Sequence, residues 1–366
     1  MKIGIAGAGL LGRLLALQLV RAGNKVTVFD PANGPEHRVA AGWTAAGMLS
    51  PMAELETANL AVFEQGVRSL ALWQGIVAVL QELAPSHPVM FKQLGSLLLA
   101  HKGDEGAAKR MIDLLAHKTP GHYAEHAPQA LSREALRRAD PAIHTSGSAW
   151  LLPIEGQIDT VQAMTAMTAA ATALGVTWRW GEMVTSLNAG EIETIPFGLS
   201  LSKPLTTTLR QAQGERSTFK FDWVFDVRGT GAKPDLPVRG VRGEIFWLHA
   251  PNVELQRPIR LLHPRHRVYL VPRDGHRIVV GASEIESEDR SPISLRSTVE
   301  LLAAAHSVIP ELAEARIIHS ETNLRPALLD NLPRLEAQDG LTSINGLFRH
   351  GWLIAPALVA QALEAL

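Results

Sequence analysis

The sequence contains no cysteine, and this absence excludes several kinds of chemistry. Disulfide bridges, thiol nucleophiles, cysteine-ligated iron–sulfur clusters and cysteine-based zinc sites are all ruled out. The chain also lacks an excess of one charge: 35 Lys and Arg stand against 36 Asp and Glu, for a formal net charge of −1. A nucleic-acid-binding protein would carry a basic excess, so we expect no nucleic-acid partner. Any electrostatic site must therefore be local.

Long uninterrupted hydrophobic segments are also missing. The apolar segment Leu70–Leu80 contains Trp73-Gln74-Gly75 and is shorter than the ~20 residues that a membrane-spanning helix needs. Glycines interrupt the apolar residues that follow Lys2, which is unlike a signal peptide. We therefore expect a cytoplasmic protein without a membrane span. The 366 residues, 46% hydrophobic and 19% charged, indicate a folded chain of about two domains.

The first thirty residues carry the most specific motif. A predicted strand, Lys2–Ala6, leads into Gly7-Ala8-Gly9-Leu10-Leu11-Gly12, and a predicted helix over Arg13–Arg21 follows. A second predicted strand, Lys25–Phe29, ends in Asp30. This order of strand, glycine turn, helix, strand and acidic residue is the dinucleotide-binding fingerprint.

Each position of the fingerprint has a physical reason. Gly7 permits the tight turn, Gly9 lets the backbone approach a pyrophosphate, and Gly12 allows close packing of helix and sheet. The helix N-terminus offers free N–H groups to the phosphates, and Asp30 can accept hydrogen bonds from a ribose. The same glycines also occur in a purely structural turn, and the fingerprint does not distinguish NAD from FAD.

The remaining sequence predicts alternating strands and helices with a second sheet inserted. Predicted helices cover 60–83, 104–117, 160–174 with Asp159 as N-cap, 301–308 and 353–366, and predicted strands cover 90–100, 176–187, 219–227, 260–271, 277–281 and 341–344. Residues 191–218 are mostly polar without clear periodicity, so we expect a mobile hairpin insertion without chemistry there. The final strand, glycine turn and helix are compatible with a second contact to the same cofactor.

The ordered set of motifs resembles the flavin-dependent amine oxidases of the D-amino-acid oxidase type, and most of all the glycine oxidases of thiamine biosynthesis. The matching motifs are Gly7–Gly12 with Asp30, Ala45–Leu49 with Glu54, Val238–Glu244, Tyr269–Arg273, Val280–Ala282, Asn323–Ala327, and Phe348–Gly351 with Leu353–Pro356. They follow the family's order and cover nearly the whole chain apart from about 191–218.

The resemblance implies an α/β fold with two domains. One is a Rossmann-like FAD-binding domain, and the other is a substrate domain with a mainly antiparallel sheet that covers the flavin. The expected boundaries are 1–87, 147–232 and 321–366 for the FAD-binding domain and 88–146 and 233–320 for the substrate domain, with 191–218 as the insertion.

The resemblance also implies roles for individual residues. Those expected at FAD are Gly7, Gly9, Leu10, Leu11, Gly12, Asp30, Pro31, Ala41, Gly42, Ala46, Gly47, Met48, Val184, Leu347, Phe348, Arg349, His350, Gly351, Trp352 and Leu353. Val184 would contact the adenine side, and Leu347–Leu353 would surround the flavin ring. Tyr269, Arg325 and Arg349 would position the substrate, because an arginine fork binds a carboxylate through two hydrogen bonds.

The implied reaction is oxidative deamination of glycine or a similar small amino acid. The α-carbon would lose a hydride to the flavin, water would hydrolyse the imine to glyoxylate and ammonia, and oxygen would be reduced to hydrogen peroxide. Three alternatives stay open: a sarcosine or D-amino-acid oxidase or dehydrogenase, an NAD(P)-dependent dehydrogenase, and a non-catalytic flavin-binding protein. One chain also leaves open whether the protein forms a homo-oligomer.

Some of these residues have simpler explanations. Without the resemblance, Arg325 fits a surface loop, Tyr269 a core strand and Met48 core filling. The pairs His263/His266 and His122/His126 have no evident third ligand nearby, so we expect surface histidines and no metal site.

Three positions depart from the family pattern. Asp30 stands where the family often has Glu, Leu347 replaces a common His, and Trp43 replaces a small polar residue. We expect these three differences to affect cofactor contacts and substrate preference more than the fold.

Overall fold

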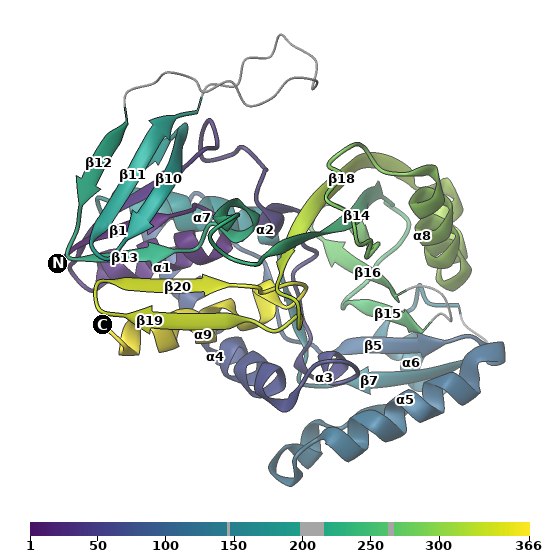
Figure 1. The fold of residues 1–366 in the computed structure, drawn as a ribbon. Coiled ribbons are helices and arrows are strands. Elements are labelled where there is room, and N and C mark those ends of the chain that lie inside the picture. The colour runs from purple at the N-terminus through teal and green to yellow at the C-terminus, as the bar shows by residue number, and fades with distance from the viewer. Residues whose placement is uncertain (145–146, 198–215, 263–266) are drawn as a thin grey trace.

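The computed structural model describes residues 1–144, 147–197, 216–262 and 267–366. Two halves, each built on its own large sheet, lie side by side (Figure 1). Both chain termini lie in the half that contains β1 and β20 (Figure 1). This two-sheet α/β arrangement is the predicted fold class.

The first half is organised around a six-stranded sheet with the order β19-β20-β13-β1-β2-β9. Its strands are β1 (Lys2–Ala6), β2 (Lys25–Asp30), β9 (Thr177–Trp180), β13 (Trp223–Asp226), β19 (Arg334–Gln338) and β20 (Leu341–Asn345). All neighbouring pairs are parallel except β19 with β20. The carboxyl ends of β1, β2, β13 and β20 therefore share one edge, where a ligand binds in such sheets.

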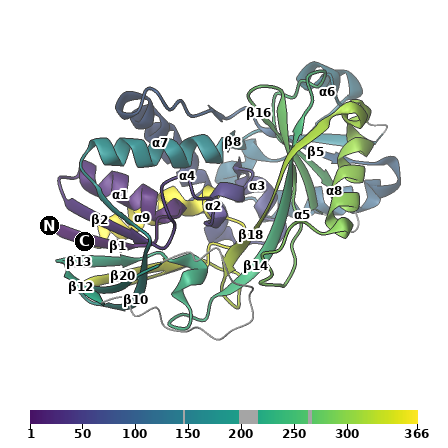
Figure 2. The same ribbon diagram turned by 90° about the horizontal axis from the view of Figure 1, so that it is seen from above.

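Helices cover one face of this sheet and a small sheet covers the other (Figure 2). The helices are α1 (Leu10–Arg21), α4 (Leu60–Leu83), α7 (Thr160–Ala173) and α9 (Gly351–Glu364), and the small sheet contains β10 (Glu182–Asn188), β11 (Glu191–Pro196) and β12 (Ser217–Lys220). α7 lies beside α1, and α4 packs against α7 and α9. Burial on both faces explains why β1 and β2 are so apolar.

The second half is organised around an eight-stranded, mainly antiparallel sheet with the order β18-β14-β17-β16-β15-β5-β7-β6. Its strands are β5 (Ser96–Ala100), β6 (Gln129–Leu131), β7 (Ser148–Leu152), β14 (Arg239–His249), β15 (Ile259–Leu262), β16 (Arg267–Arg273), β17 (Arg277–Gly281) and β18 (Arg316–Ala327). α8 (Leu295–Val308) packs on this sheet, and Leu301 and Ala305 share a buried cluster with Val280.

Short elements connect the halves or lie at their edges. They are α2 (Ala41–Thr44), α3 (Pro51–Glu54), α5 (Glu105–Lys118), α6 (Arg133–Ala139), the strands β3 (Met48–Leu49), β4 (Phe91–Lys92) and β8 (Gly156–Ile158), and the 3₁₀ helices Lys102–Asp104, Gly121–His126, Gly229–Ala232 and Pro310–Glu314. No helix in the described ranges has the length and hydropathy needed to cross a membrane.

Several predicted elements are confirmed. α4 has the predicted bounds, and the Asp159 carboxylate accepts hydrogen bonds from the N–H groups of Val161 and Gln162, both at 3.0 Å. The predicted strand over 277–281 is confirmed as β17, which a turn at Asp274-Gly275 joins to β16. These features depend on neighbouring residues, which is why local patterns identify them.

Three predicted strands are wrong in extent. The strand over 90–100 divides into β4 and β5 near Gly95, at φ +79°, and the strand over 176–187 divides into β9 and β10 at Gly181, at φ +74°. The strand over 219–227 divides into β12 and β13. In the first two segments a left-handed glycine turns the chain, and in all three the two strands belong to different sheets. The strand predicted over 260–271 consists of β15 and β16, and residues 263–266 between them lie outside the described ranges.

The prediction that 191–218 is a mobile hairpin insertion is right about the antiparallel pairing of its ends, β11 with β12, but wrong in placing these ends outside the core. Residues Glu191–Pro196 form the central strand of the small sheet, and β12 begins at Ser217. Ile192 is fully buried against Phe29 and Val184, between the small sheet and the six-stranded sheet. Residues 198–215 lie outside the described ranges, so the prediction stands only for them.

We therefore expect Ile192→Ala to lower the free energy of unfolding by about 2–4 kcal/mol, because it leaves a cavity in a closed apolar layer. Ile195→Ala on the same strand is the matched control. Ile195 is only half-buried, so this substitution should lower the free energy of unfolding by less. Urea unfolding followed by tryptophan fluorescence measures both. Equal effects would show that β11 adds little to the core.

The predicted domain boundaries cross the large sheet. β7 and β18 belong to the eight-stranded sheet, although the boundaries at 147 and 321 place most of their residues in the FAD-binding domain. The division into domains stays a prediction, and the sheets favour assigning β7 and β18 to the substrate half.

Candidate active site

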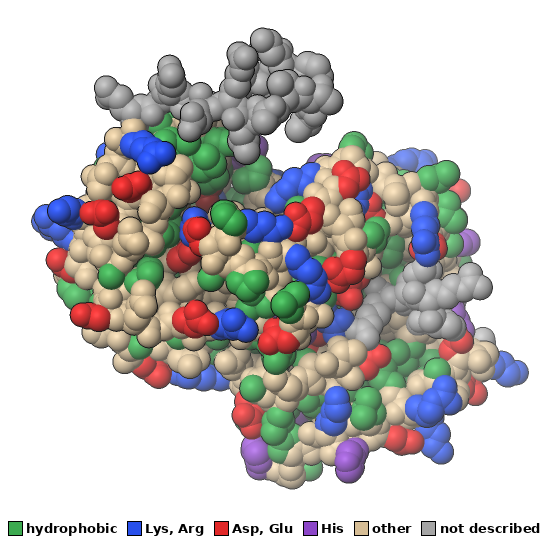
Figure 3. Space-filling model, in the orientation of Figure 1, with side chains coloured by type: hydrophobic (Ala, Val, Ile, Leu, Met, Phe, Trp, Pro, Cys, Tyr) green, Lys and Arg blue, Asp and Glu red, His purple; other side chains and the backbone are tan. Residues whose placement is uncertain are grey.

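A cavity of about 1320 Å³ runs from the carboxyl edge of the six-stranded sheet to the face of the eight-stranded sheet. Figure 3 shows a recess between the halves, with Lys, Arg, Asp and Glu side chains at its rim. Every residue predicted to contact cofactor or substrate lines this cavity except Gly12. One cavity therefore unites segments from both ends and the middle of the chain.

The glycine loop after β1 leaves room for a ligand at the N-terminus of α1. Gly7 has φ +104°, and a Cβ at Gly12 would lie 1.9 Å from the Gly7 carbonyl oxygen. Gly12 is therefore needed for packing, which explains why it does not line the cavity. A Cβ at Gly9 would meet nothing closer than 3.6 Å, so the space above Gly9 is open. These positions fit a diphosphate bound by backbone N–H groups.

The Asp30 carboxylate is held by backbone N–H groups on both sides. Its two oxygens accept hydrogen bonds from the N–H of Ala8 at 2.6 Å and the N–H of Ala32 at 2.8 Å. Asp30 thus connects the glycine loop to the end of β2 and also lines the cavity. Because each carboxylate oxygen has more than one acceptor site, contact with a ribose remains compatible with these bonds.

Arg13 is a buried support for this loop that the sequence reasoning missed. Its guanidinium donates to the carbonyl oxygens of Ala8 at 2.8 Å, Met164 at 3.0 Å and Pro35 at 2.9 Å. It also lies 4.9 Å from the ring centroid of Trp43. Burial lowers the pKa of Arg13 to about 10, so it remains charged at neutral pH. Trp43 therefore faces Arg13 and is absent from the cavity lining.

The small residues after β2 line the middle of the cavity. Ala41 and Gly42 belong to α2, and a Cβ at Gly42 would lie 3.2 Å from the Leu10 Cβ. Gly47 has φ +65°, and a Cβ there would lie 2.1 Å from the Ile158 carbonyl oxygen. Met48 is half-buried beside this turn, so it contributes both to the core and to the lining.

The turn between β20 and α9 closes the cavity from the side of the C-terminus. Phe348 has φ +47°, a conformation that a non-glycine side chain rarely adopts. The Trp352 indole N–H donates to the Gly42 carbonyl oxygen at 3.0 Å, which joins α9 to α2. Leu347 adds an apolar wall, as expected from its replacement of a polar residue.

Two further parts of the lining were not predicted as cofactor contacts. The turn after β13, Arg228–Gly231, lines the cavity, and Arg228 is held by ion pairs to Asp226 at 2.8 Å and Asp235 at 2.9 Å. The Asn323 side-chain amide donates to the Ala40 carbonyl at 3.2 Å and the Thr44 hydroxyl at 3.1 Å. In the sequence, Arg228–Gly231 is a glycine-containing turn, and Asn323 begins the family motif Asn323–Ala327.

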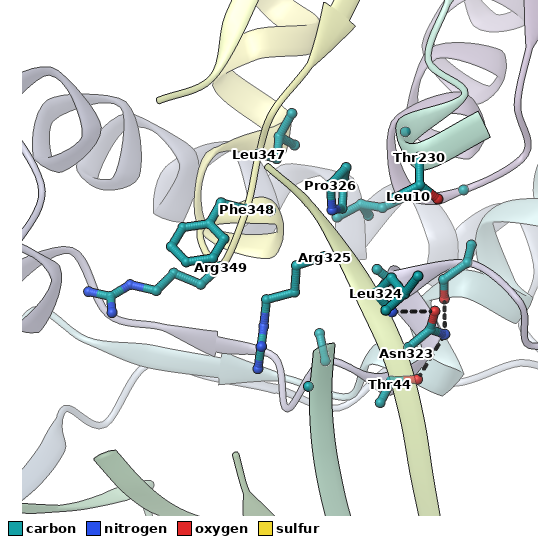
Figure 4. A pocket seen from close by; sticks show the side chains of 18 of the residues that line it. Leu10, Thr44, Thr230, Asn323, Leu324, Arg325, Pro326, Leu347, Phe348 and Arg349 are labelled. Atoms are coloured by element: carbon teal, nitrogen blue, oxygen red, sulfur yellow. Dashed lines mark hydrogen bonds between the residues drawn. The ribbon is translucent and has the colours of Figure 1, made fainter. Parts of the chain in front are cut away.

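Arg325 lines the cavity, and its side chain extends away from β18 (Figure 4). Its Nη1 donates to the carbonyl oxygens of Ser283 at 3.1 Å and Arg242 at 3.4 Å. A Cβ at Gly243 would lie 2.6 Å from the Arg325 Cζ, so the missing side chain makes room for the guanidinium. Backbone carbonyls orient this group without neutralising its charge, which leaves it able to bind an anion.

Tyr269 lies beside Arg325 on the same wall. A Cβ at Gly281 would lie 2.8 Å from the Tyr269 hydroxyl, so a second glycine makes room for the phenol. Burial raises the pKa of Tyr269, and the positive charges of Arg325, Arg260 and Arg273 oppose that shift. Tyr269 is therefore protonated at neutral pH and available as a hydrogen-bond donor to an anion.

Arg349 also lines the cavity, but its charge has carboxylate partners within the protein. Its side chain extends away past Phe348 (Figure 4), and its Nε donates to the Glu54 carboxylate at 2.9 Å. It also donates to the Thr57 hydroxyl and lies 3.7 Å from Glu284. Two carboxylates therefore already surround the Arg349 charge. Its predicted contact with the substrate stays a prediction, and the geometry favours Arg325 for a carboxylate.

Glu54 is the centre of a buried charged cluster that the sequence did not identify as a site. Its carboxylate lies 3.1 Å from the His350 Nδ1 and 3.5 Å from the Arg260 guanidinium, besides Arg349. Burial acts to raise the pKa of Glu54, but the hydrogen bond from His350 and the charges of Arg349 and Arg260 hold it well below its ordinary range. Glu54 is therefore ionised at neutral pH.

We expect Glu54→Gln to lower the free energy of unfolding by about 3 kcal/mol at pH 7, because the buried guanidinium groups of Arg260 and Arg349 lose a shared anion. The folded-state pKa lies below the ordinary value of 4.5, so the contribution is complete above that value and is lost as the pH falls through the folded-state pKa. The difference between wild type and variant should shrink below about pH 4.5. Urea unfolding across pH tests this, with exposed Glu82→Gln as control. A constant difference across pH would contradict it.

His122 and His126 both lie beside the Tyr123 ring in tilted orientations. No group of three metal-ligating side chains occurs in the described part of the chain. His263 and His266 lie outside the described ranges.

A glycine loop at one helix N-terminus, a second βα turn beside it, and an arginine on the facing sheet together define a dinucleotide-dependent oxidoreductase. The chain belongs to the DAO family of FAD-dependent oxidoreductases, whose family model matches residues 2–366. FAD is therefore its cofactor. The open space above Gly9 and the turn that places α9 against α2 fit such a group.

Individual relatives agree with this family. A Rhizobium etli protein named as a thiamine biosynthesis oxidoreductase, ThiO, is 34% identical over the whole chain and 96% of its own length. A glycine oxidase of Geobacillus kaustophilus is 24% identical, covering 99% of this chain and 92% of the relative. The crystal structure of glycine oxidase from Geobacillus kaustophilus superposes with a TM-score of 0.80 at 22% identity, covering 99% of this chain and 93% of that one.

Proposed function

We propose that this protein oxidises glycine or a similar small amino acid, and that Arg325 binds the substrate carboxylate. The products would be an imine that water hydrolyses to glyoxylate and ammonia, with oxygen as the electron acceptor and hydrogen peroxide as its product. The names of the relatives from Rhizobium etli and Geobacillus kaustophilus support glycine as substrate and thiamine biosynthesis as the setting. The FAD-binding residues proposed are the predicted ones given above, all of which line the cavity except Gly12.

The observation that carries the proposal is the position of the Arg325 guanidinium in the cavity. It is oriented by two carbonyl oxygens, with the phenol of Tyr269 beside it. A carboxylate there would receive charge-assisted hydrogen bonds from Arg325 and a neutral one from Tyr269. Flavin accepts a hydride from the α-carbon of a bound amine, so this chain's task is to hold that carbon in place.

The space around Arg325 favours a small substrate. Gly243 and Gly281 are both needed to seat Arg325 and Tyr269, and Ile245 lies on the same wall. None of these three offers a charged partner for an amine, and the lining carboxylates Glu54 and Glu284 already face Arg349, so we expect the substrate amine to react in its neutral form. No side chain is assigned as a base.

The first test is a visible absorption spectrum of the purified protein, followed by anaerobic addition of glycine. We expect flavin bands that glycine bleaches. If only sarcosine or a D-amino acid bleaches the bands, that compound is the substrate and glycine is not. Bands that no small amine bleaches would favour a flavin-binding protein without this activity, and a protein that binds no FAD would contradict the proposal.

A further inference from the structure

Arg260 is a second cation on the wall that carries Arg325 and Tyr269. It lies on β15 directly opposite Tyr269 of β16, in register, and both side chains line the cavity. Directly opposite residues on one face of a sheet have Cβ atoms about 5 Å apart. Tyr269 also pairs with Gly281 of β17, over which the phenol extends. The wall therefore presents Arg260 on β15, Tyr269 on the adjacent β16, and Arg325 on β18, with β17 and β14 between Tyr269 and Arg325.

The Arg260 guanidinium is buried but weakly partnered. Its side chain is 11% exposed, and its Nε has no hydrogen-bond partner among the described residues. Its contact with Glu54 is 3.5 Å long, whereas Arg349 and His350 approach the same carboxylate to 2.9 Å and 3.1 Å. A buried guanidinium with an unsatisfied N–H is costly unless a ligand completes its bonds.

The cations around Arg260 outnumber their carboxylate partners by one. Arg260 and Arg349 pair with Glu54 and Glu284, whereas Arg325 has only backbone carbonyl partners among the described residues. The other nearby carboxylate, Glu155, accepts hydrogen bonds from the Ala53 N–H at 2.8 Å and the Ser96 hydroxyl at 2.5 Å. Burial raises the pKa of Glu155, which reduces its ability to neutralise Arg260.

We propose that Arg260 forms a second anion-binding position for substrates that carry two carboxylates. One carboxylate binds Arg325, and the other, on the side chain or on a substituent of the amine nitrogen, binds Arg260 on the far side of Tyr269. This inference rests on the proposed function, because it also requires Arg325 to bind the first carboxylate of the substrate. It extends the substrate class from glycine to acidic amino acids and N-carboxyalkyl glycines.

Two matched substrate pairs test the position: D-aspartate against D-asparagine, and N-carboxymethylglycine against N-methylglycine. Each pair keeps the reacting carbon and changes the charge of the second group. We expect the wild type to prefer the charged member of at least one pair by about tenfold or more in kcat/KM. The pair that shows the preference identifies where the second carboxylate is attached. Arg260→Gln should abolish the preference, and Arg260→Lys should retain part of it.

Binding provides a readout that does not depend on turnover. Malonate and acetate are titrated into the flavin-loaded protein, and the change in flavin absorption gives Kd for each. Malonate should bind more tightly than acetate in the wild type, and Arg260→Gln should remove that difference. The control is Arg277→Gln on β17, whose guanidinium donates to the Asp274 carbonyl outside the cavity lining.

The outcomes separate this inference from the proposed function. A wild type that prefers neither charged substrate nor malonate overturns the second position, as does an Arg260→Gln variant that keeps the preference. Flavin that no amine reduces contradicts the proposed function, while the malonate titration still decides the role of Arg260. A preference lost equally in Arg277→Gln would show a general charge effect and overturn the inference.

Discussion

Arg325→Ala is expected to lower kcat/KM for glycine on the order of 100-fold while FAD stays bound. The substrate carboxylate would lose a charge-assisted pair of hydrogen bonds, worth about 3 kcal/mol in a buried site. The cofactor loop and the α9 turn are separate from the guanidinium, so flavin content should not change. Steady-state kinetics and the flavin absorption of the purified variant measure the two effects.

Two variants show whether the loss is specific. Arg325→Lys keeps the charge but not the planar fork, so it should recover only part of the activity. Arg316→Ala removes an arginine from the exposed end of the same strand, where its guanidinium donates to the Glu314 carbonyl, and should behave like the wild type. Unchanged kinetics in Arg325→Ala would exclude the carboxylate role.

Gly12→Ala and Gly9→Ala are expected to fail in different ways, although both alter the same motif. At Gly12 a Cβ would lie 1.9 Å from the Gly7 carbonyl oxygen, so the glycine loop or α1 must move. We expect a loss of several kcal/mol of stability and little soluble protein. At Gly9 the nearest atom would be 3.6 Å away, so the chain should fold normally. Its Cβ would occupy the open space beside the helix N-terminus and weaken FAD binding.

Thermal unfolding of the two variants without FAD, together with FAD titration of the folded one, distinguishes these effects. Gly23→Ala is a useful reference, because nothing lies within 4 Å of its Cβ and only its φ of +83° opposes the change. A stable Gly12→Ala protein would show that the loop tolerates displacement. A Gly9→Ala protein with wild-type affinity for FAD would remove Gly9 from the cofactor site.

The tertiary structure distinguishes residues that the motifs treated alike. Arg325 and Arg349 were both predicted to position substrate and both line the cavity, but Glu54, 295 residues away in the chain, pairs with Arg349, whereas Arg325 is held by backbone carbonyls. Arg260 had no motif of its own, because its importance comes from the strand register that places it opposite Tyr269.

The order of residues alone indicates the class of fold, the dinucleotide loop and the segments that line the cavity. These depend on local order: a strand, a glycine turn, a helix and their recurrence at the end of the chain. The folded structure was needed to see which arginine pairs with a carboxylate, which glycines make room for side chains, and how 191–196 completes the core. Those properties depend on contacts between segments far apart in the chain, and a local pattern carries no information about the charge or the space that a distant segment supplies.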